Sequence, residues 1–187
     1  VTENEHQFFV DWESGQKTGF FIDQRENRRL LANYVKGKSV LNTFCYTGGF
    51  SVYALNAGAS EVHSVDSSKK AIELTERNAE LSQAPVRHEA FAIDTFAFLK
   101  GKEDRYDVII LDPPAFAKSK NVRHNALMGY KRLNAEAMRK IKPGGILFTF
   151  SCSQVVDKYL FNNTIMAAAI EAGRNIKIMH HLSQPAD

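Results

Sequence analysis

The chain has 187 residues, of which 44% are hydrophobic and 24% are charged, as is typical of one globular domain that buries its own core. Its formal net charge of +3 would tolerate a polyanionic partner but lacks the basic excess of a dedicated nucleic-acid-binding protein. Two cysteines are too few for a disulfide scaffold and have no metal-ligand spacing, so we expect two thiols and no metal site.

The hydropathy and the ends of the chain bear on its location. No run of 18 or more apolar residues is present, and the first residues, VTENEHQFFVDW, are polar. We therefore expect neither a membrane span nor a secretory signal, and we expect the protein in the cytoplasm. The chain lacks an initiator methionine and ends on QPAD without a closing element, so we expect it to be part of a longer protein.

The first 24 residues differ in character from the rest. The runs HQFFVDW and TGFFID flank ESGQK, whose Ser14-Gly15 pair is a turn signal. We predict an N-terminal β-hairpin within residues 1–24, with its strands in residues 6–24, and then a helix over residues 25–36.

From Lys38 onward, strand patterns alternate with helix patterns. Short β-branched or apolar runs predict strands at 38–44, 61–66, 86–92, 106–112, 145–152 and 175–182. Helical spacing and end signals predict helices at 49–58, 68–81, 94–100, between a loop at 113–122 and Lys142, and at 155–172. Near-continuous apolar strands in such an alternation predict an α/β fold with a parallel sheet and helices on both faces.

Ligands of an open parallel sheet bind at the carboxyl ends of its strands. After the first strand, Gly48 and Gly49 in the run CYTGGF allow a tight turn and the close approach of a ligand. Asp66 ends the second strand, where a carboxylate can accept hydrogen bonds from both ribose hydroxyls of a nucleoside. Asp94 follows the third strand, where it can accept from the adenine amine. A plain strand-to-helix turn and two helix N-caps are the structural alternatives at these positions.

The glycine spacing separates two classes of cofactor. A dinucleotide-binding enzyme is expected to show G-x-G-x-x-G where a helix meets the pyrophosphate, and TGGFSVYA has the glycine pair without that spacing. This argues against a dehydrogenase. It favours a nucleoside cofactor without phosphates, and S-adenosylmethionine fits.

The fourth predicted strand ends in Asp112-Pro113-Pro114-Ala115-Phe116. Two prolines fix the backbone as extended and remove two amide donors, which would hold Asp112 rigidly over the reactive end of the cofactor. The ring of Phe116 can stack on a planar base, as happens in enzymes that act on flipped bases. The alternative is a rigid loop at a strand end.

The fifth predicted strand ends in Phe150-Ser151-Cys152-Ser153. A thiol beside Asp112 would face the same pocket, and its attack on carbon 6 of a cytosine would make carbon 5 nucleophilic enough to take a methyl group. Asp112 would then hold the base at its Watson–Crick edge. The alternative is a buried cysteine that only packs, which is how we interpret Cys45.

Six motifs occur in order from about Thr18 to Asp187, namely TGFFIDQRENR, NTFCYTGGFSVYA, SVDSS, ILDPPAF, GYKRLN and GGILFTFSCS. In this order they resemble the ribosomal RNA large-subunit methyltransferases of the class I S-adenosylmethionine fold, most closely the bacterial group that makes 5-methylcytosine in 23S ribosomal RNA. The resemblance implies a Rossmann-like methyltransferase domain over residues 25–187, with S-adenosylmethionine as cofactor and ribosomal RNA as partner. Members of that family also carry an RNA-binding domain and a linking domain, which again implies a longer protein.

The resemblance places FFIDQR against the cofactor and matches Cys152 to the cysteine of the cytosine-modifying members. With the strand-end residues, the expected cofactor site comprises Phe20, Asp23, Gln24, Arg25, Phe44, Tyr46, Thr47, Gly48, Phe50, Asp66, Ser67, Asp94 and Asp112. The expected catalytic residues are Asp112 and Cys152, and the expected substrate-binding residues are Pro113, Pro114, Phe116, Lys118, Lys120 and Arg123.

Basic residues cluster after Asp112 and in the following helix, which includes Lys131 and Arg132. They would contact RNA phosphates beside the active site, or alternatively form a solvated face. We interpret His180 and His181 on the last predicted strand as structural.

Two other functions stay open. The methyl group could go to a guanine or adenine nitrogen, with Asp112 and the Pro113 carbonyl orienting an amine and Cys152 only packing. The chain could also be an RNA-binding module without turnover. Loss of the thiol separates the carbon from the nitrogen reaction, and cofactor binding separates both from the module.

Overall fold

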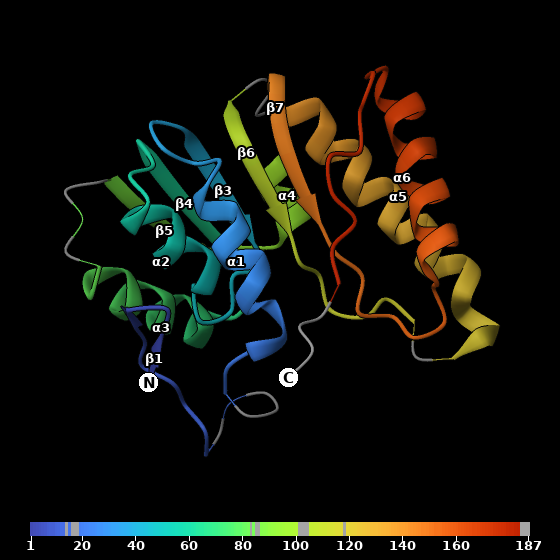
Figure 1. Ribbon diagram of the computed structural model, residues 1–187. Coiled ribbons are helices and arrows are strands. Elements are labelled where there is room, and N and C mark those ends of the chain that lie inside the picture. The colour runs from blue at the N-terminus through green and yellow to red at the C-terminus, as the bar shows by residue number, and fades with distance from the viewer. Residues whose placement is uncertain are drawn as a thin grey trace.

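The computed structural model describes residues 1–13, 15, 19–82, 84, 87–100, 105–117 and 119–183, with only the backbone of Lys120 (Figure 1). The strands are β1 (Thr2–Glu3), β2 (His6–Gln7), β3 (Ser39–Thr43), β4 (Glu61–Asp66), β5 (Arg87–Ala92), β6 (Tyr106–Leu111) and β7 (Ile141–Thr149). The helices are α1 (Arg25–Ala32), α2 (Gly49–Asn56), α3 (Lys69–Glu80), α4 (Thr95–Leu99), α5 (Arg123–Lys140) and α6 (Lys158–Ala172), with 3-10 turns η1 (Ile22–Gln24) and η2 (Lys120–Val122).

Five parallel strands form the main sheet in the order β5-β4-β3-β6-β7. Strand β3 lies at the centre, and all of its residues are buried. The chain continues from β3 to β4 on one side and returns to β6 on the other side, and such a switch point is where open α/β sheets bind ligands. The predicted α/β fold with a Rossmann-like parallel sheet is therefore confirmed.

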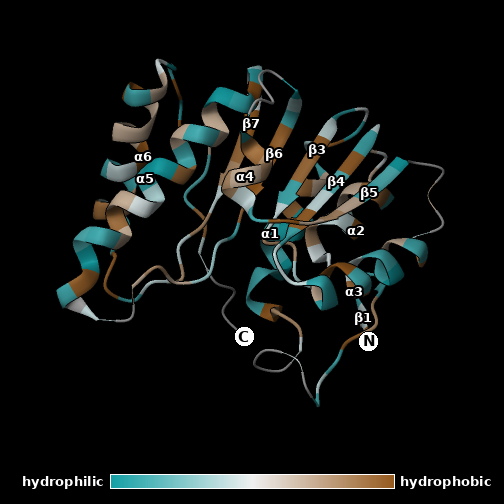
Figure 2. Ribbon diagram, turned by 180° about the vertical axis from the view of Figure 1, so that it is seen from behind, coloured by the Kyte–Doolittle hydropathy of each residue, from teal (hydrophilic) through white to brown (hydrophobic). Residues whose placement is uncertain are grey.

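Helices cover both faces of this sheet. Val40 and Ile110 pack toward α1, α2 and α3, whereas their neighbours Leu41 and Ile109 pack toward α4 and α5, because successive strand residues point to opposite faces. Helix α6 packs on α5. Figure 2 shows hydrophobic residues along β6 and β7, while α3 is largely hydrophilic on the side in view.

An N-terminal hairpin is present, but it is shorter than predicted and lies nearer the N-terminus. It consists of β1 and β2, and Thr2 pairs with Gln7 in antiparallel register. The turn residues Asn4 and Glu5 both have positive φ, as a two-residue type I′ turn requires.

The predicted N-terminal hairpin is confirmed, but the strands that we expected in residues 6–24 are not formed in the described residues after Gln7. No residue of 8–13 or 19–21 lies in a strand, and Ser14 of the predicted turn is outside the described residues. Phe8 and Phe20 instead pack against α2. Burial of these rings holds the segment in place, together with two backbone hydrogen bonds between Phe8 and Val1.

Strand β7 begins and ends earlier than the predicted strand 145–152. Ile141 already pairs with Tyr106, and the register then shifts before Ile146 pairs with Val108. The intervening KPGG therefore forms an irregularity on an edge strand, where a proline is tolerated. The pairing of β7 with β6 ends at Thr149, opposite Leu111. Pro113 and Pro114 follow shortly after β6 and have no amide hydrogen with which to continue it.

The predicted sixth strand at 175–182 is not formed. A segment becomes a strand only where its backbone pairs with a neighbour, and residues 174–183 have no ladder with β7. Side chains hold this segment, since Arg174 Nη2 donates to the carbonyl of Ile141 at 2.8 Å and the Tyr34 hydroxyl bonds His180 Nε2 at 2.7 Å. Figure 1 shows it as an irregular red chain after α6.

Two helices differ by more than two residues from their predicted bounds. Helix α1 ends at Ala32 and follows the 3-10 turn η1. Helix α6 begins at Lys158, because the Asp157 carboxylate caps it by accepting from the amides of Tyr159 and Leu160. Within the described ranges, no helix combines the length and the apolar character that crossing a membrane requires.

Candidate functional site

The loop between β3 and α2 adopts a strained backbone. Phe44 and Tyr46 have positive φ values of 54° and 49°, which residues other than glycine seldom adopt. Gly48, with φ of 77°, is the N-cap of α2, and a Cβ there would lie 2.8 Å from Cγ2 of Thr75. Such strain is concentrated at ligand sites, and this loop lies at the switch point of the sheet.

Asp66 joins this loop to the start of α3. Its Oδ2 accepts from the amide of Tyr46 at 3.1 Å, and its Oδ1 accepts from the amide of Ser68 at 2.9 Å. Each carboxylate oxygen has a second lone pair, so the half-buried group can still accept from a ligand. The predicted contact with a ribose stays a prediction.

Asp94 is the N-cap of α4, because its Oδ1 accepts from the amide of Ala97 at 2.9 Å. The structural alternative is thus present at this position, and the carboxylate is exposed at the end of β5. Its contact with an adenine remains a prediction.

The other expected cofactor residues differ in exposure. Phe44, Asp23 and Arg25 are half-buried, Thr47 is buried and Ser67 is exposed. Phe50 lies in the core beside Phe150, with ring centroids 5.7 Å apart, so its ring supports the loop from inside.

The segment FFIDQR lies against both the loop and the end of β6. The ring of Phe21 meets Tyr46 edge-on at 5.3 Å, and Gln24 Nε2 donates to Asp112 Oδ2 at 3.1 Å. Phe20 is buried under the guanidinium of Arg28, which lies 4.7 Å from the ring centroid. The structure thus brings this segment and Asp112 together across the fold.

Arg28 was missed in the sequence analysis. It is buried and pairs with Glu3 at 2.8 and 2.7 Å, and it also donates to the carbonyl of Phe21 at 3.0 Å. Gly49 lies beneath it, since a Cβ at that glycine would be 3.1 Å from Arg28 Cδ. The motif FFIDQRENR contains the residue, but an arginine in a polar helix shows no pattern that predicts burial.

Cys152 lies beside the Asp-Pro-Pro segment, as predicted. Its Sγ is 3.7 Å from the carbonyl oxygen of Pro113, and the Phe150 amide donates to Leu111 at 2.9 Å, which keeps the ends of β6 and β7 adjacent. The side chain of Cys152 is exposed, and that of Asp112 is half-buried. A thiol and a carboxylate therefore reach the same end of the sheet.

Cys45 has the opposite environment. It is buried, and burial raises the pKa of its thiol to about 12, with a smaller opposing effect from the hydrogen bond to Thr75. A thiol that stays protonated is a poor nucleophile, so the structure supports a packing role for Cys45.

Phe116 and Ser153 tie the Asp-Pro-Pro loop to α5. The ring of Phe116 packs on Tyr130 with centroids 4.6 Å apart, and Gly129 allows this because a Cβ would lie 3.0 Å from that ring. Ser153 Oγ bonds the Tyr130 hydroxyl at 3.0 Å and accepts from the amide of Ala117 at 3.4 Å. Sequence analysis did not single out Tyr130 or this use of Ser153, because a contact between distant segments leaves no local pattern in the sequence.

The basic cluster is only partly described. Arg123 is exposed at the first residue of α5, whereas Lys118 and the side chain of Lys120 lie outside the described residues. Lys131 pairs with Glu171 at 2.8 Å, and the Arg132 guanidinium lies 4.9 Å from the Phe96 ring centroid. Contacts within the protein thus occupy Lys131 and Arg132.

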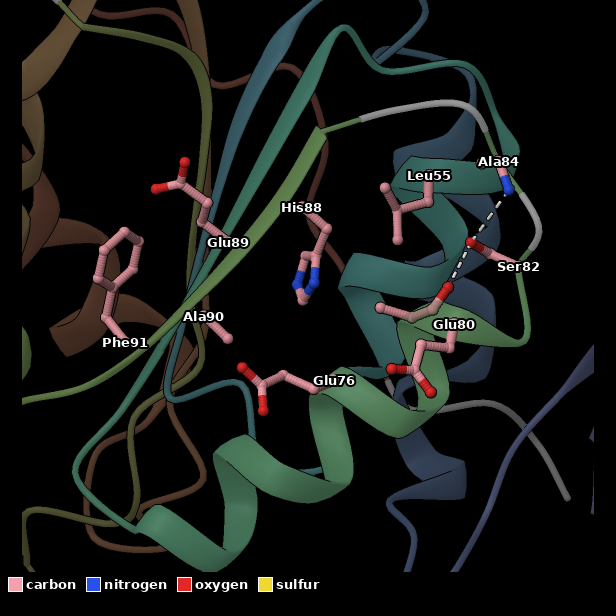
Figure 3. A pocket seen from close by; sticks show the side chains of 10 residues that line it. Leu55, Glu76, Glu80, Ser82, Ala84, His88, Glu89, Ala90 and Phe91 are labelled. Carbon is pink, nitrogen blue, oxygen red and sulfur yellow. Dashed lines mark hydrogen bonds between the residues drawn. The ribbon is translucent and has the colours of Figure 1, made fainter.

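A groove of about 740 Å³ lies elsewhere, between α3 and β5 (Figure 3). Glu76 and His88 point into it from opposite sides, and none of the expected site residues lines it. Burial, followed by the proximity of His63, lowers the pKa of His88 to about 4, and its Nε2 bonds Ser64 Oγ at 2.8 Å. The groove is separate from the carboxyl ends of β6 and β7.

Residues 1–185 match the family model described as S-adenosylmethionine-dependent methyltransferase. The chain belongs to this methyltransferase family. Its cofactor is S-adenosylmethionine, as predicted.

Relatives of this methyltransferase include the ribosomal RNA large subunit methyltransferase I of Aeromonas hydrophila, which is 46% identical over 97% of this chain and 47% of its own length. The protein of the same name from Photobacterium profundum is 44% identical over 100% of this chain and 48% of its own length. The chain thus spans about half the length of the curated relatives it matches.

Solved structures agree with the fold of this methyltransferase. The protein SMU.776, crystallised in complex with SAH, superposes with a TM-score of 0.86 at 28% identity, over 98% of this chain and 49% of the other. A SAM-dependent methyltransferase from Streptococcus mutans gives 0.76 at 30% identity, over 90% and 45%.

Proposed function

We propose that this chain transfers the methyl group of S-adenosylmethionine to carbon 5 of a cytosine in large-subunit ribosomal RNA. The observation that carries the proposal is the exposed thiol of Cys152 at 3.7 Å from the Pro113 carbonyl, next to the carboxylate of Asp112. The names of relatives that are 46% and 44% identical support ribosomal RNA as the substrate.

The cofactor would lie over the loop between β3 and α2. Asp66, which already fixes the loop through Tyr46, would accept from the ribose hydroxyls, and the exposed Asp94 would accept from the adenine amine. The strained φ values of Phe44 and Tyr46 support a ligand at this loop, because backbone strain of this kind occurs mainly at active sites and ligand-binding sites.

In the proposed reaction, the thiolate of Cys152 bonds to carbon 6 of the cytosine, and the electron pair of the 5,6 double bond becomes available at carbon 5. Carbon 5 takes the methyl group from the sulfonium, which leaves as the neutral thioether S-adenosylhomocysteine. A base then removes the proton on carbon 5, and the carbon–sulfur bond breaks to restore the double bond and the thiolate. Asp112 would hold the cytosine at its Watson–Crick edge by accepting from the amine and would favour the N3-protonated form, which makes the ring more susceptible to addition.

The two cysteines support this division of roles. The buried Cys45, with its pKa raised to about 12, is unsuited to attack, whereas Cys152 is exposed where β7 meets β6. Arg123, exposed at the start of α5, and the adjacent Lys118 and Lys120 would contact RNA phosphates, which positions the substrate without reading its sequence.

A covalent trap tests the proposal. RNA with 5-fluorocytosine at the target has no removable proton on carbon 5, so the enzyme should remain bonded to it. Cys152→Ala should form no adduct and transfer no methyl group while still binding S-adenosylmethionine, and Cys45→Ala is the matched control that should form the adduct. Methylation by Cys152→Ala, or a product with the methyl group on a nitrogen, would replace this mechanism with transfer to a base nitrogen.

A further inference from the structure

The side chains of Gln24 and Asp112 meet although 88 residues separate them in the chain. Gln24 Nε2 donates to Asp112 Oδ2 at 3.1 Å, and Gln24 Oε1 accepts from Asn27 Nδ2 at 2.6 Å. A hydrogen-bonded series thus runs from the start of α1 to the end of β6.

The two residues after Asp112 cannot donate a backbone hydrogen bond to its carboxylate. An aspartate at the end of a strand commonly accepts from the amide one or two residues ahead. Pro113 and Pro114 occupy both positions and have no amide hydrogen. The Gln24 amide supplies an N–H to this carboxylate, which neither proline can do.

The orientation of the Gln24 amide is determined by its neighbour. Gln24 ends the 3-10 turn η1 and precedes Arg25, the first residue of α1, so Asn27 lies one turn further on the same side. Asn27 is buried at 7% exposure and donates to Gln24 Oε1. A reversed Gln24 amide would direct its oxygen at the Asp112 carboxylate, which is electrostatically unfavourable.

We propose that Gln24 is a positioning residue that holds the Asp112 carboxylate in its reactive orientation, with Asn27 holding Gln24. Each polar atom of the Gln24 amide has a partner within the protein, which fixes the side chain between Asn27 and Asp112. The inference rests on the proposed function, in which Asp112 holds the target base.

Gln24→Met tests this role, because methionine keeps the length and shape of the side chain but cannot donate a hydrogen bond. The initial assay is methyl transfer from labelled S-adenosylmethionine to an unmodified large-subunit ribosomal RNA transcript. We expect a fall of about 10-fold to 100-fold in kcat from misplacement of Asp112. We expect the affinity for S-adenosylmethionine, measured by calorimetry, to stay within about twofold.

Arg29→Gln is the matched control on the same helix, since the side chain of Arg29 is 72% exposed. It should leave kcat and cofactor affinity unchanged. If Gln24→Met does not fold, Gln24→Asn keeps a polar amide but shortens its reach, and it should give the same fall. A wild-type kcat in the folded variant would overturn the inference, as would a parallel loss of cofactor affinity.

A double-mutant cycle with Asp112→Asn asks whether Gln24 acts through Asp112. If it does, Gln24→Met should cause no further loss of residual activity in the Asp112→Asn background, whereas independent effects would multiply. Multiplying effects would overturn the inference.

A readout without RNA separates this inference from the proposed function. In the folded chain, the carboxyl carbon of Asp112 can be titrated by NMR, and loss of the Gln24 donor should raise the titration midpoint, because a hydrogen bond to the charged form is removed. The Arg29→Gln control should show no rise. A raised midpoint in a chain that methylates no RNA would support the Gln24 contact and overturn the proposed function, whereas an unchanged midpoint would overturn the Gln24 role.

Discussion

The guanidinium of Arg28 and the carboxylate of Glu3 form a two-point ion pair, with Nε to Oε1 at 2.8 Å and Nη2 to Oε2 at 2.7 Å. The two side chains are only 3% and 8% exposed. The Tyr53 hydroxyl donates to Glu3 Oε1 at 3.0 Å. Burial, with the charge of Glu3 as the second cause, raises the pKa of Tyr53 to about 12. This cluster attaches the N-terminal hairpin to α1 and α2, and Arg28 lies against Gly49 at the start of α2.

Glu3→Gln should destabilise the protein by about 3 kcal/mol, because removal of one partner leaves the other charge buried without compensation. The measurement is the free energy of unfolding in urea. Glu171→Gln, which removes the exposed partner of Lys131, is the control and should have a much smaller effect, since exposed pairs contribute little. Equal losses in the two variants would show that the Arg28 pair contributes no more than a surface pair.

Gly48→Ala should destabilise the protein more than Gly173→Ala. Both glycines have positive φ, 77° and 66°, so each variant should lose about 1–2 kcal/mol from the backbone conformation alone. A Cβ at Gly48 would also lie 2.8 Å from Thr75 Cγ2, whereas nothing lies within 4 Å of one at Gly173. The measurement is the free energy of unfolding in urea. Equal losses in the two variants would mean that the contact with Thr75 relaxes without loss of stability.

Asp66→Ala should weaken the binding of S-adenosylmethionine by about 1.5–3 kcal/mol, the usual contribution of hydrogen bonds to a charged group. Part of this effect would come from the loop, because Asp66 also accepts from the amide of Tyr46. Calorimetry measures the affinity. Asp157→Ala removes the N-cap of α6 and is the matched control, which should lower stability without changing affinity. Unchanged affinity in Asp66→Ala would contradict the proposed cofactor site.

Acid should destabilise the fold through His88. Burial, with His63 as the second cause, lowers the pKa of this residue from 6.5 to about 4. As the pH falls below 6.5, the unfolded chain binds a proton at His88 while the folded chain does not. The free energy of unfolding is therefore at its full value above pH 6.5 and decreases as the pH falls toward 4. The expected loss is about 3 kcal/mol.

His88→Asn should flatten the pH dependence of the unfolding free energy between pH 6.5 and 4. His124→Asn changes an exposed histidine at the start of α5 and is the control, which should retain the wild-type slope. If the two variants show the same slope, the burial of His88 does not account for acid sensitivity.

The sequence alone was sufficient for the α/β class, for five strands of the sheet and for the ends of the strands where polar residues gather. These features depend on local patterns, since apolar runs and glycines constrain their own segment. The juxtaposition of Cys152 with the Asp-Pro-Pro segment also followed, because carboxyl ends of parallel strands share one edge of a sheet.

Tertiary structure alone decided which distant side chains meet and which segments pair. The contact of Gln24 with Asp112 and the burial of Arg28 on Glu3 join residues with no common local pattern. The segment 175–182 has the composition of a strand but lies unpaired, since a strand exists only where another backbone accepts its hydrogen bonds. Local propensity acts on the residue itself, whereas pairing and burial depend on what the rest of the chain places beside it.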